Sequence, residues 1–235
     1  MELKRIIFEV FYRVWMGRRV FAKALVIPFA ISVGLDLLDL VGLPKILDIG
    51  DEVLSVAVYG WFAVTVHRLV LLGPESVPEW GLRRISKREV VFVLSFAFIT
   101  VVALLPVILF TSLPVDSFAI GLLTLLIYVY LFSRLSLVLP AIAIDRWLTP
   151  LDSWRLSRPH QARLVFVLIL FPIMLFMPFL LVIILIVSIS PMLLGSVVPL
   201  YVAEVFESLA TTFLLVFTVS ALSIVYREIT RLTTF

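Results

Sequence analysis

Six long apolar stretches alternate along the chain with short polar segments. They cover residues 21–41, 53–72, 90–113, 118–144, 164–189 and 200–226. About twenty apolar residues in an α-helix cross the hydrocarbon core of a bilayer, so this pattern predicts six transmembrane helices. The stretches lack the alternation of polar and apolar residues found in barrel strands, and they are about twice too long for such strands. We therefore expect an all-α, polytopic integral membrane protein.

A basic amphipathic segment precedes the first predicted pair of spans. Ile6 and Val10 share one face of a helix in this segment, while Arg5, Glu9 and Arg13 share the opposite face. Such a helix lies in the plane of the membrane surface with its apolar side buried. The pattern predicts a short interfacial helix that leads into the first hairpin of spans.

Two further basic segments connect the hairpins. Each begins with a sequence typical of a helix N-terminus, Ser76-Val-Pro-Glu79 in one and Thr149-Pro-Leu-Asp152 in the other. Tryptophan, leucine and arginine residues follow both sequences. We expect two more short interfacial helices there.

These two segments also resemble each other in sequence. Residues 80–94 match residues 154–168 at seven of fifteen positions, without a gap and at an offset of 74 residues. One interpretation is a single membrane domain, 1–235, built from three parallel repeats over 1–74, 75–148 and 149–235. The other is that membrane helices share Val, Leu and Phe by composition alone.

Composition supports a membrane location. Hydrophobic residues make up 63% of the 235 residues, and the mean hydropathy is +1.20. Six spans with short loops fill this length, so we expect no extramembrane catalytic domain and no soluble enzyme fold. The absence of cysteine excludes disulfides and thiolate chemistry.

The distribution of positive charge predicts the orientation. Of the 19 lysine and arginine residues, only Lys45 lies in the connections after the first, third and fifth spans. Connections rich in lysine and arginine stay on the cytoplasmic side of a membrane. We therefore expect both termini to be cytoplasmic.

The region 134–158 carries a family resemblance. It places Arg134 in the fourth span, a Leu-Pro140 break after it, and Trp154, Ser157 and Arg158 in the interfacial segment that follows. This arrangement resembles the signature of YciC-type bacterial inner-membrane proteins and the six-helix membrane domain of some glycerophosphoryl diester phosphodiesterases. The resemblance implies a bacterial inner (cytoplasmic) membrane location, a six-helix fold and a link to lipid or envelope biology. It implies no phosphodiesterase activity, because the catalytic barrel is missing from this chain.

The sequence contains little that indicates catalysis. His67 and His160 lie in unrelated contexts without carboxylates at metal-ligand spacing, and no nucleotide-binding or serine-hydrolase motif occurs. We expect no enzyme activity, no metal and no cofactor.

The basic connections are the best candidates for binding. Their cations lie beside the bilayer, where anionic headgroups attract lysine and arginine, so we interpret them as cytoplasmic lipid contacts and not as a nucleic-acid site. Other membrane proteins are the second class of partner. The candidate lipid-contact residues are Arg83, Arg84, Lys87, Arg88, Arg155 and Arg158.

Arg134, with Ser133 and Ser136, forms a candidate polar site inside the membrane. A charge near the bilayer centre costs several kcal/mol, roughly 2.5–3.5 on insertion scales, unless it is paired or hydrated. Three interpretations stay open: a packed and hydrogen-bonded structural role, a side chain that snorkels to the interface because Pro140 ends the span, and a substrate or headgroup site.

Two acidic pairs form a second candidate site. Asp36 and Asp39 lie near the outer end of the first span, and Glu204 and Glu207 have the same spacing near the outer end of the sixth. Four carboxylates at one depth could hold a hard cation, and the alternative is a set of solvated helix ends. Taken together, the sequence predicts a non-catalytic membrane module that acts as scaffold, assembly partner or lipid-organising subunit. The alternative is a small transporter or channel with a cavity near Arg134.

Overall fold

The computed structural model describes residues 3–40, 48–78, 86–111, 118–194 and 198–230, and these residues are helical apart from short connections, with no strand among them. The first three long segments are α1 (Leu3–Met16), α2 (Arg18–Leu40) and α3 (Asp48–Leu72). The middle of the chain forms α4 (Lys87–Thr111), α5 (Phe118–Leu135) and α6 (Val138–Ala143). The remainder forms α7 (Pro150–Ser157), α8 (Gln161–Val165), α9 (Phe171–Leu194) and α10 (Val198–Ile229).

Five helical segments of the described chain are long and apolar enough to cross a membrane. They are Leu54–Leu72, Lys87–Phe110, Phe118–Ala143, Pro150–Leu185 and Val205–Ile229. The protein is therefore an all-α, polytopic membrane protein. The first predicted span, 21–41, corresponds to α2, and the side chains of residues 35–40 lie outside the described part of the chain.

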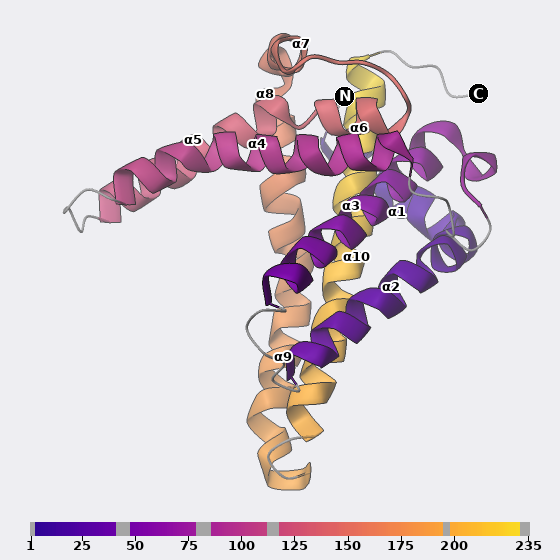
Figure 1. Ribbon diagram of the computed structural model, residues 1–235, viewed down its shortest axis with the longest axis vertical. Helices are drawn as coiled ribbons and strands as arrows, with labels where there is room; N and C mark the ends of the chain where they lie inside the picture. Colours follow the sequence, from indigo (N-terminus) through magenta and orange to yellow (C-terminus); the bar gives the residue numbers. More distant parts are fainter. Residues whose placement is uncertain (1–2, 41–47, 79–85, 112–117, 195–197, 231–235) are drawn as a thin grey trace.

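The long helices form three hairpins, α2 with α3, α4 with α5 and α9 with α10 (Figure 1). Helix α10 also packs on α1, α2 and α3, which makes it the central element of the core. The C-terminal part of α10 is buried from Val219 to Tyr226. In Figure 1, α1, α6, α7, α8 and the end of α10 lie at one end of the molecule, which we call the basic end. The α4–α5 and α9–α10 hairpins extend from it in different directions.

The predicted amphipathic helices are found in the described residues at two of the three positions. Helix α1 precedes the α2–α3 hairpin, and α7 precedes α8 and the α9–α10 hairpin. Residues 79–85, where the third was predicted, lie outside the described part. The three-fold repeat itself stays a prediction.

The predicted fourth span is broken near its end. Helix α5 ends at Leu135 and α6 begins at Val138, with Ser136 and Leu137 forming a turn between them. Pro140 explains the position, because a proline has no N–H to donate and its ring clashes with the carbonyl four residues earlier, which here belongs to Ser136. That carbonyl accepts from the N–H of Leu139 at 3.1 Å instead. The span therefore breaks one turn before the proline.

One of the two predicted helix caps is confirmed, and the other is wrong. The Thr149 Oγ1 accepts from the backbone N–H of Asp152 at 3.1 Å and so caps α7. Ser76 does not cap a helix; its hydroxyl donates to the carbonyl of Gly73 at 2.7 Å. The capping box belongs to Ser86 and Glu89 at the start of α4, where the Ser86 N–H donates to the Glu89 carboxylate at 2.8 Å.

Candidate functional site

Arg134 lies inside the protein at the basic end, at the last turn of α5. Its side chain is buried, with 6% of the residue exposed. The guanidinium carbon lies 5.0 Å from the ring centroid of Tyr130 and 5.3 Å from that of Trp154. Arg134 Nη2 donates to the Tyr130 hydroxyl at 3.0 Å, and Nη1 donates to the Trp154 carbonyl at 3.3 Å. Of the three interpretations of Arg134, this geometry is that of the packed, hydrogen-bonded one.

Hydroxyl and amide groups surround Arg134 and join α5 to α7 and α8. Ser153 Oγ donates to the Arg134 carbonyl at 2.8 Å, and Gln161 Nε2 donates to Ser133 Oγ at 2.5 Å. Ser136 Oγ donates to the Ser133 carbonyl at 3.0 Å. All three serines are fully buried. The break in the span thus leaves backbone groups that side chains from the following helices satisfy.

Most of the buried polar atoms around Arg134 make hydrogen bonds within the protein. Two buried atoms, Arg134 Nε and Gln161 Oε1, make no hydrogen bond with any described residue. The aromatic rings of Tyr130 and Trp154 cover the guanidinium, and cation–π contacts of this kind are strongest where water is excluded. The arrangement can hold α5, α7 and α8 together, and it does not present the guanidinium to a substrate.

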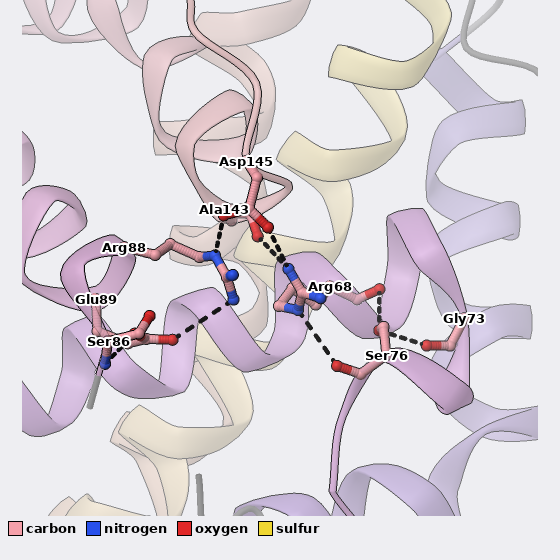
Figure 2. A network of polar contacts seen from close by, with 8 residues as sticks. All are labelled: Arg68, Gly73, Ser76, Ser86, Arg88, Glu89, Ala143 and Asp145. Atoms are coloured by element: carbon pink, nitrogen blue, oxygen red, sulfur yellow. Dashed lines mark hydrogen bonds and ion pairs between the residues drawn. The ribbon is translucent and has the colours of Figure 1, made fainter. Parts of the chain in front are cut away.

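Arg68, Arg88 and Asp145 form a second cluster, just beyond the end of α6 (Figure 2). Arg88 Nε donates to Asp145 Oδ1 at 2.6 Å, and Arg68 Nη1 lies 3.3 Å from Asp145 Oδ2. The two arginine side chains are about one-tenth exposed, whereas that of Asp145 is 57% exposed. One carboxylate therefore links α3, α4 and the connection after α6.

The backbone at Asp145 is unusual. Asp145 has a φ of 59°, in the left-handed region that favours glycine. Its N–H donates to the Ile142 carbonyl at 3.0 Å, and the N–H of Arg146 donates to the Ala141 carbonyl at 2.9 Å. These two bonds form a Schellman motif at the end of α6. Arg68 completes the cap by donating to the Ala143 carbonyl at 3.1 Å.

A buried polar pair connects α3 to α10. His67 Nδ1 lies 2.7 Å from Ser223 Oγ, and both residues are almost fully buried. Ser223 Oγ donates its own proton to the Val219 carbonyl at 2.7 Å, so the histidine is the donor to the serine. A serine nucleophile needs the opposite arrangement, in which histidine accepts the hydroxyl proton. The hydrogen bond between His67 and Ser223 thus connects α3 to α10.

Helix α1 is attached to the end of α10 by charge. The Glu9 carboxylate accepts from Arg227 and, at 2.9 Å, from Arg13 Nε, and Arg13 also donates to the Val70 carbonyl. Burial alone would raise the pKa of Glu9, but the hydrogen bonds and charges of Arg227 and Arg13 outweigh it and lower that pKa. Of the polar face predicted for this helix, Glu9 and Arg13 therefore contact other helices in a compact ion cluster, whereas Arg5 is exposed.

The predicted lipid-contact residues divide into three groups. Lys87, Arg155 and Arg158 are exposed, as a headgroup contact requires. Arg88 departs from the predicted lipid contact, because its side chain is largely buried and binds Asp145. Its Nη1 lies 3.7 Å from Glu89 Oε1. Arg83 and Arg84 lie outside the described residues.

The predicted acidic site of Asp36, Asp39, Glu204 and Glu207 falls mostly outside the described residues. The side chains of Asp36, Asp39 and Glu204 lie outside them, and Glu207 is exposed. In the part of the chain that the structure describes, no three carboxylate or imidazole side chains come together as metal ligands would.

Sequence reasoning found Arg134 but missed its companions. Tyr130 precedes Arg134 by one helical turn and Trp154 lies within the same motif, so the two rings could have been found from spacing alone. The partners Arg68 and Asp145 are 77 residues apart, and His67 and Ser223 are 156 apart, so no local pattern links them. Comparison of the chain with protein-family models, with curated proteins and with solved structures gave no match.

Proposed function

We propose that this protein is a non-catalytic membrane module that organises anionic lipids around its basic end. The observation that carries the proposal is the exposed surface of α1. Phe8, Tyr12, Trp15 and Met16 follow one another at helical spacing and are 53–71% exposed, while Ile6 and Val10 on the other side are buried in the core. Aromatic residues with this exposure are typical of the interface between headgroups and acyl chains.

Exposed cations accompany this aromatic surface. Lys4 and Arg5 are exposed on α1, and Arg155 and Arg158 are exposed in and just after α7, at the same end of the molecule (Figure 1). Each cation near an anionic membrane surface contributes about 1 kcal/mol of attraction. Aromatic anchors beside exposed cations support a surface that selects anionic headgroups.

The interior supports a structural role and not a catalytic one. The buried side chains of Arg134 and His67 and the exposed carboxylate of Asp145 each contact groups on other helices, as described above. The alternative of a transporter with a cavity near Arg134 has less support, because two aromatic rings cover that guanidinium.

The same proposal includes orientation and family. Placing the basic end in the cytoplasm agrees with the distribution of lysine and arginine, and it puts α1 and α7 against the leaflet that is rich in anionic lipid. Membership of the YciC-type inner-membrane proteins rests on the residues of the 134–158 motif, in which Arg134 and Trp154 contact each other.

The test is lipid retention by the full chain purified in mild detergent. Phosphatidylglycerol and phosphatidylcholine are titrated in parallel, and bound lipids are counted by native mass spectrometry. We expect the parent to retain more phosphatidylglycerol than phosphatidylcholine, and a variant with Lys4, Arg5, Arg155 and Arg158 all changed to Gln to retain less phosphatidylglycerol than the parent without a lower melting temperature.

The matched control exchanges lysine and arginine at the same four positions. It keeps the charge, so it should keep the preference. Equal retention of both lipids by the parent would contradict the proposal.

A further inference from the structure

An apolar groove runs between α1, α2 and α10, and it begins at the basic end. Its volume is about 510 Å³, within the range of roughly 300–1,000 Å³ that ligand sites occupy. The side chains that line it are almost all apolar, with Phe21, Leu25 and Phe29 on one wall and Phe213, Val216 and Phe217 on the other. Such a lining suits a hydrocarbon chain.

The length of the groove along α2 is close to the thickness of one leaflet. Along α2 it extends from Arg18 to Phe29, and eleven residues of helix rise about 16 Å. The hydrocarbon core of a bilayer is about 30 Å thick, so one leaflet contributes about 15 Å. The groove from Arg18 to Phe29 is therefore long enough for most of one acyl chain.

Arg18 is held in place where the groove opens. Its Nη1 donates to the Trp15 carbonyl at 2.9 Å, and its guanidinium carbon lies 5.0 Å from the centroid of the Trp15 ring. Trp15 is 67% exposed and itself lines the groove. A cation fixed in this way loses little side-chain entropy when an anion binds.

The charge around this opening favours an anion. Residues 3–23 contain six cations and one carboxylate, Glu9. That carboxylate is already paired with Arg13 and Arg227. Arg18 and Arg19 are both exposed at the start of α2.

We propose that the groove between α1, α2 and α10 binds one acyl chain of an anionic phospholipid, whose phosphate is held by Arg18 and Arg19. This site rests on the proposed function and makes it specific. It assigns one ordered lipid to one place, whereas general attraction to the basic end would leave lipids spread over the surface. A lipid in this place would also join the interfacial helix α1 to the core helices α2 and α10.

The experiment uses the full chain in vesicles that contain phosphatidylglycerol with a photoactivatable diazirine on its acyl chain. After illumination, the modified residues are mapped by mass spectrometry. We expect modification to concentrate on residues 11–29 and 209–217, and not on the exposed apolar faces of α4 and α9. Modification spread evenly over all lipid-facing helices would overturn the proposal.

Two matched pairs of variants test the groove and the cation separately. Ala22→Trp fills the groove with an indole, and Ala97→Trp places the same side chain on an exposed position of α4. The first should abolish labelling of residues 11–29 and 209–217, and the second should leave it unchanged. Arg18→Gln should lower this labelling about fivefold, whereas Arg155→Gln should not lower it.

A parallel labelling with phosphatidylcholine separates this proposal from the proposed function. Equal labelling of the groove by both lipids would overturn the anionic occupant, even where the detergent experiment shows a preference for phosphatidylglycerol at the surface. Groove labelling that is selective for phosphatidylglycerol in the variant with Lys4, Arg5, Arg155 and Arg158 changed to Gln would support the groove independently of those surface cations.

Discussion

The guanidinium of Arg134 lies 5.3 Å from the centroid of the Trp154 ring and donates to the Trp154 backbone carbonyl at 3.3 Å. One side chain at the end of α5 thereby binds both the ring and the main chain of α7. Loss of the guanidinium removes two cation–π interactions, with Tyr130 and Trp154, and one hydrogen bond to each of these residues.

Arg134→Leu should therefore lower the free energy of unfolding by about 2–4 kcal/mol. Arg134→Lys should recover only part of this loss, because an ammonium group lacks the planar fork that reaches both Tyr130 and Trp154. The measurement is the melting temperature of the purified protein in detergent. The control is Arg155→Leu, at an exposed position on α7, and a melting temperature for Arg134→Leu equal to this control would contradict a structural role.

Asp145 combines a charge and a strained backbone, and three substitutions separate them. Asp145→Asn keeps a side chain that tolerates the left-handed region but removes the charge that Arg68 and Arg88 share. Asp145→Gly removes the charge and also relieves the backbone, and Asp145→Ala removes the charge and adds strain of roughly 1 kcal/mol.

The expected order of melting temperatures is parent, then Gly or Asn, then Ala. All three variants should be less stable than the parent, because the two arginines would lie near each other without a carboxylate between them. An alanine variant as stable as the glycine variant would show that the φ of 59° carries no cost.

Much of the fold could be predicted from the sequence because hydropathy acts locally. A bilayer leaves helical spans as the only solution for long apolar stretches, so the positions of α3, α4, α9 and α10 followed from pattern alone. The cap at Thr149 was also predictable, since its hydroxyl reaches a backbone N–H only three residues away. Ser86 could have been chosen over Ser76 as well, because its box directly precedes the apolar residues of α4.

The remaining contacts depend on how helices pack against each other. The pattern on α1 shows a polar face, but it does not show that Glu9 meets Arg227 at the other end of the chain. Arg88 likewise has a partner that is distant in sequence. In the sequence it is one of four cations in a basic connection, and only the fold brings Asp145 within 2.6 Å of its Nε.

Cysteine labelling tests the orientation of the spans, and the native chain has no cysteine to interfere. Single cysteines at Lys45, Asp116 and Gly195 should react with an impermeant maleimide outside intact spheroplasts. Cysteines at Lys87 and Arg158, which are exposed at the basic end, should react only after lysis. Ser157 serves as a burial control, because it is fully buried and its cysteine variant should react slowly on either side. Labelling of the Lys87 cysteine from outside intact spheroplasts would contradict the predicted orientation.

Glu9 should make the attachment of α1 sensitive to acid. Arg227 and Arg13 hold the pKa of this carboxyl below its ordinary value of 4.5, so the folded protein binds the proton less readily than the unfolded chain. A group with a lowered pKa contributes stability above its unfolded pKa, and this contribution is lost as the pH falls through the lowered value. The melting temperature of the parent should therefore fall as the pH is lowered below 4.5. For a partly exposed cluster, the expected loss of unfolding free energy is about 1 kcal/mol.

Glu9→Gln is the variant that isolates this contribution. It should be less stable than the parent at pH 7, because Arg227 and Arg13 lose their shared anion, and the difference should shrink as the pH falls and the parent carboxyl becomes protonated. Glu75→Gln removes a carboxylate from an exposed position and should show no such convergence. A constant difference between Glu9→Gln and the parent from pH 7 to pH 3 would contradict an attachment of α1 to α10 by charge, because it would show that protonation of the Glu9 carboxyl does not weaken this contact.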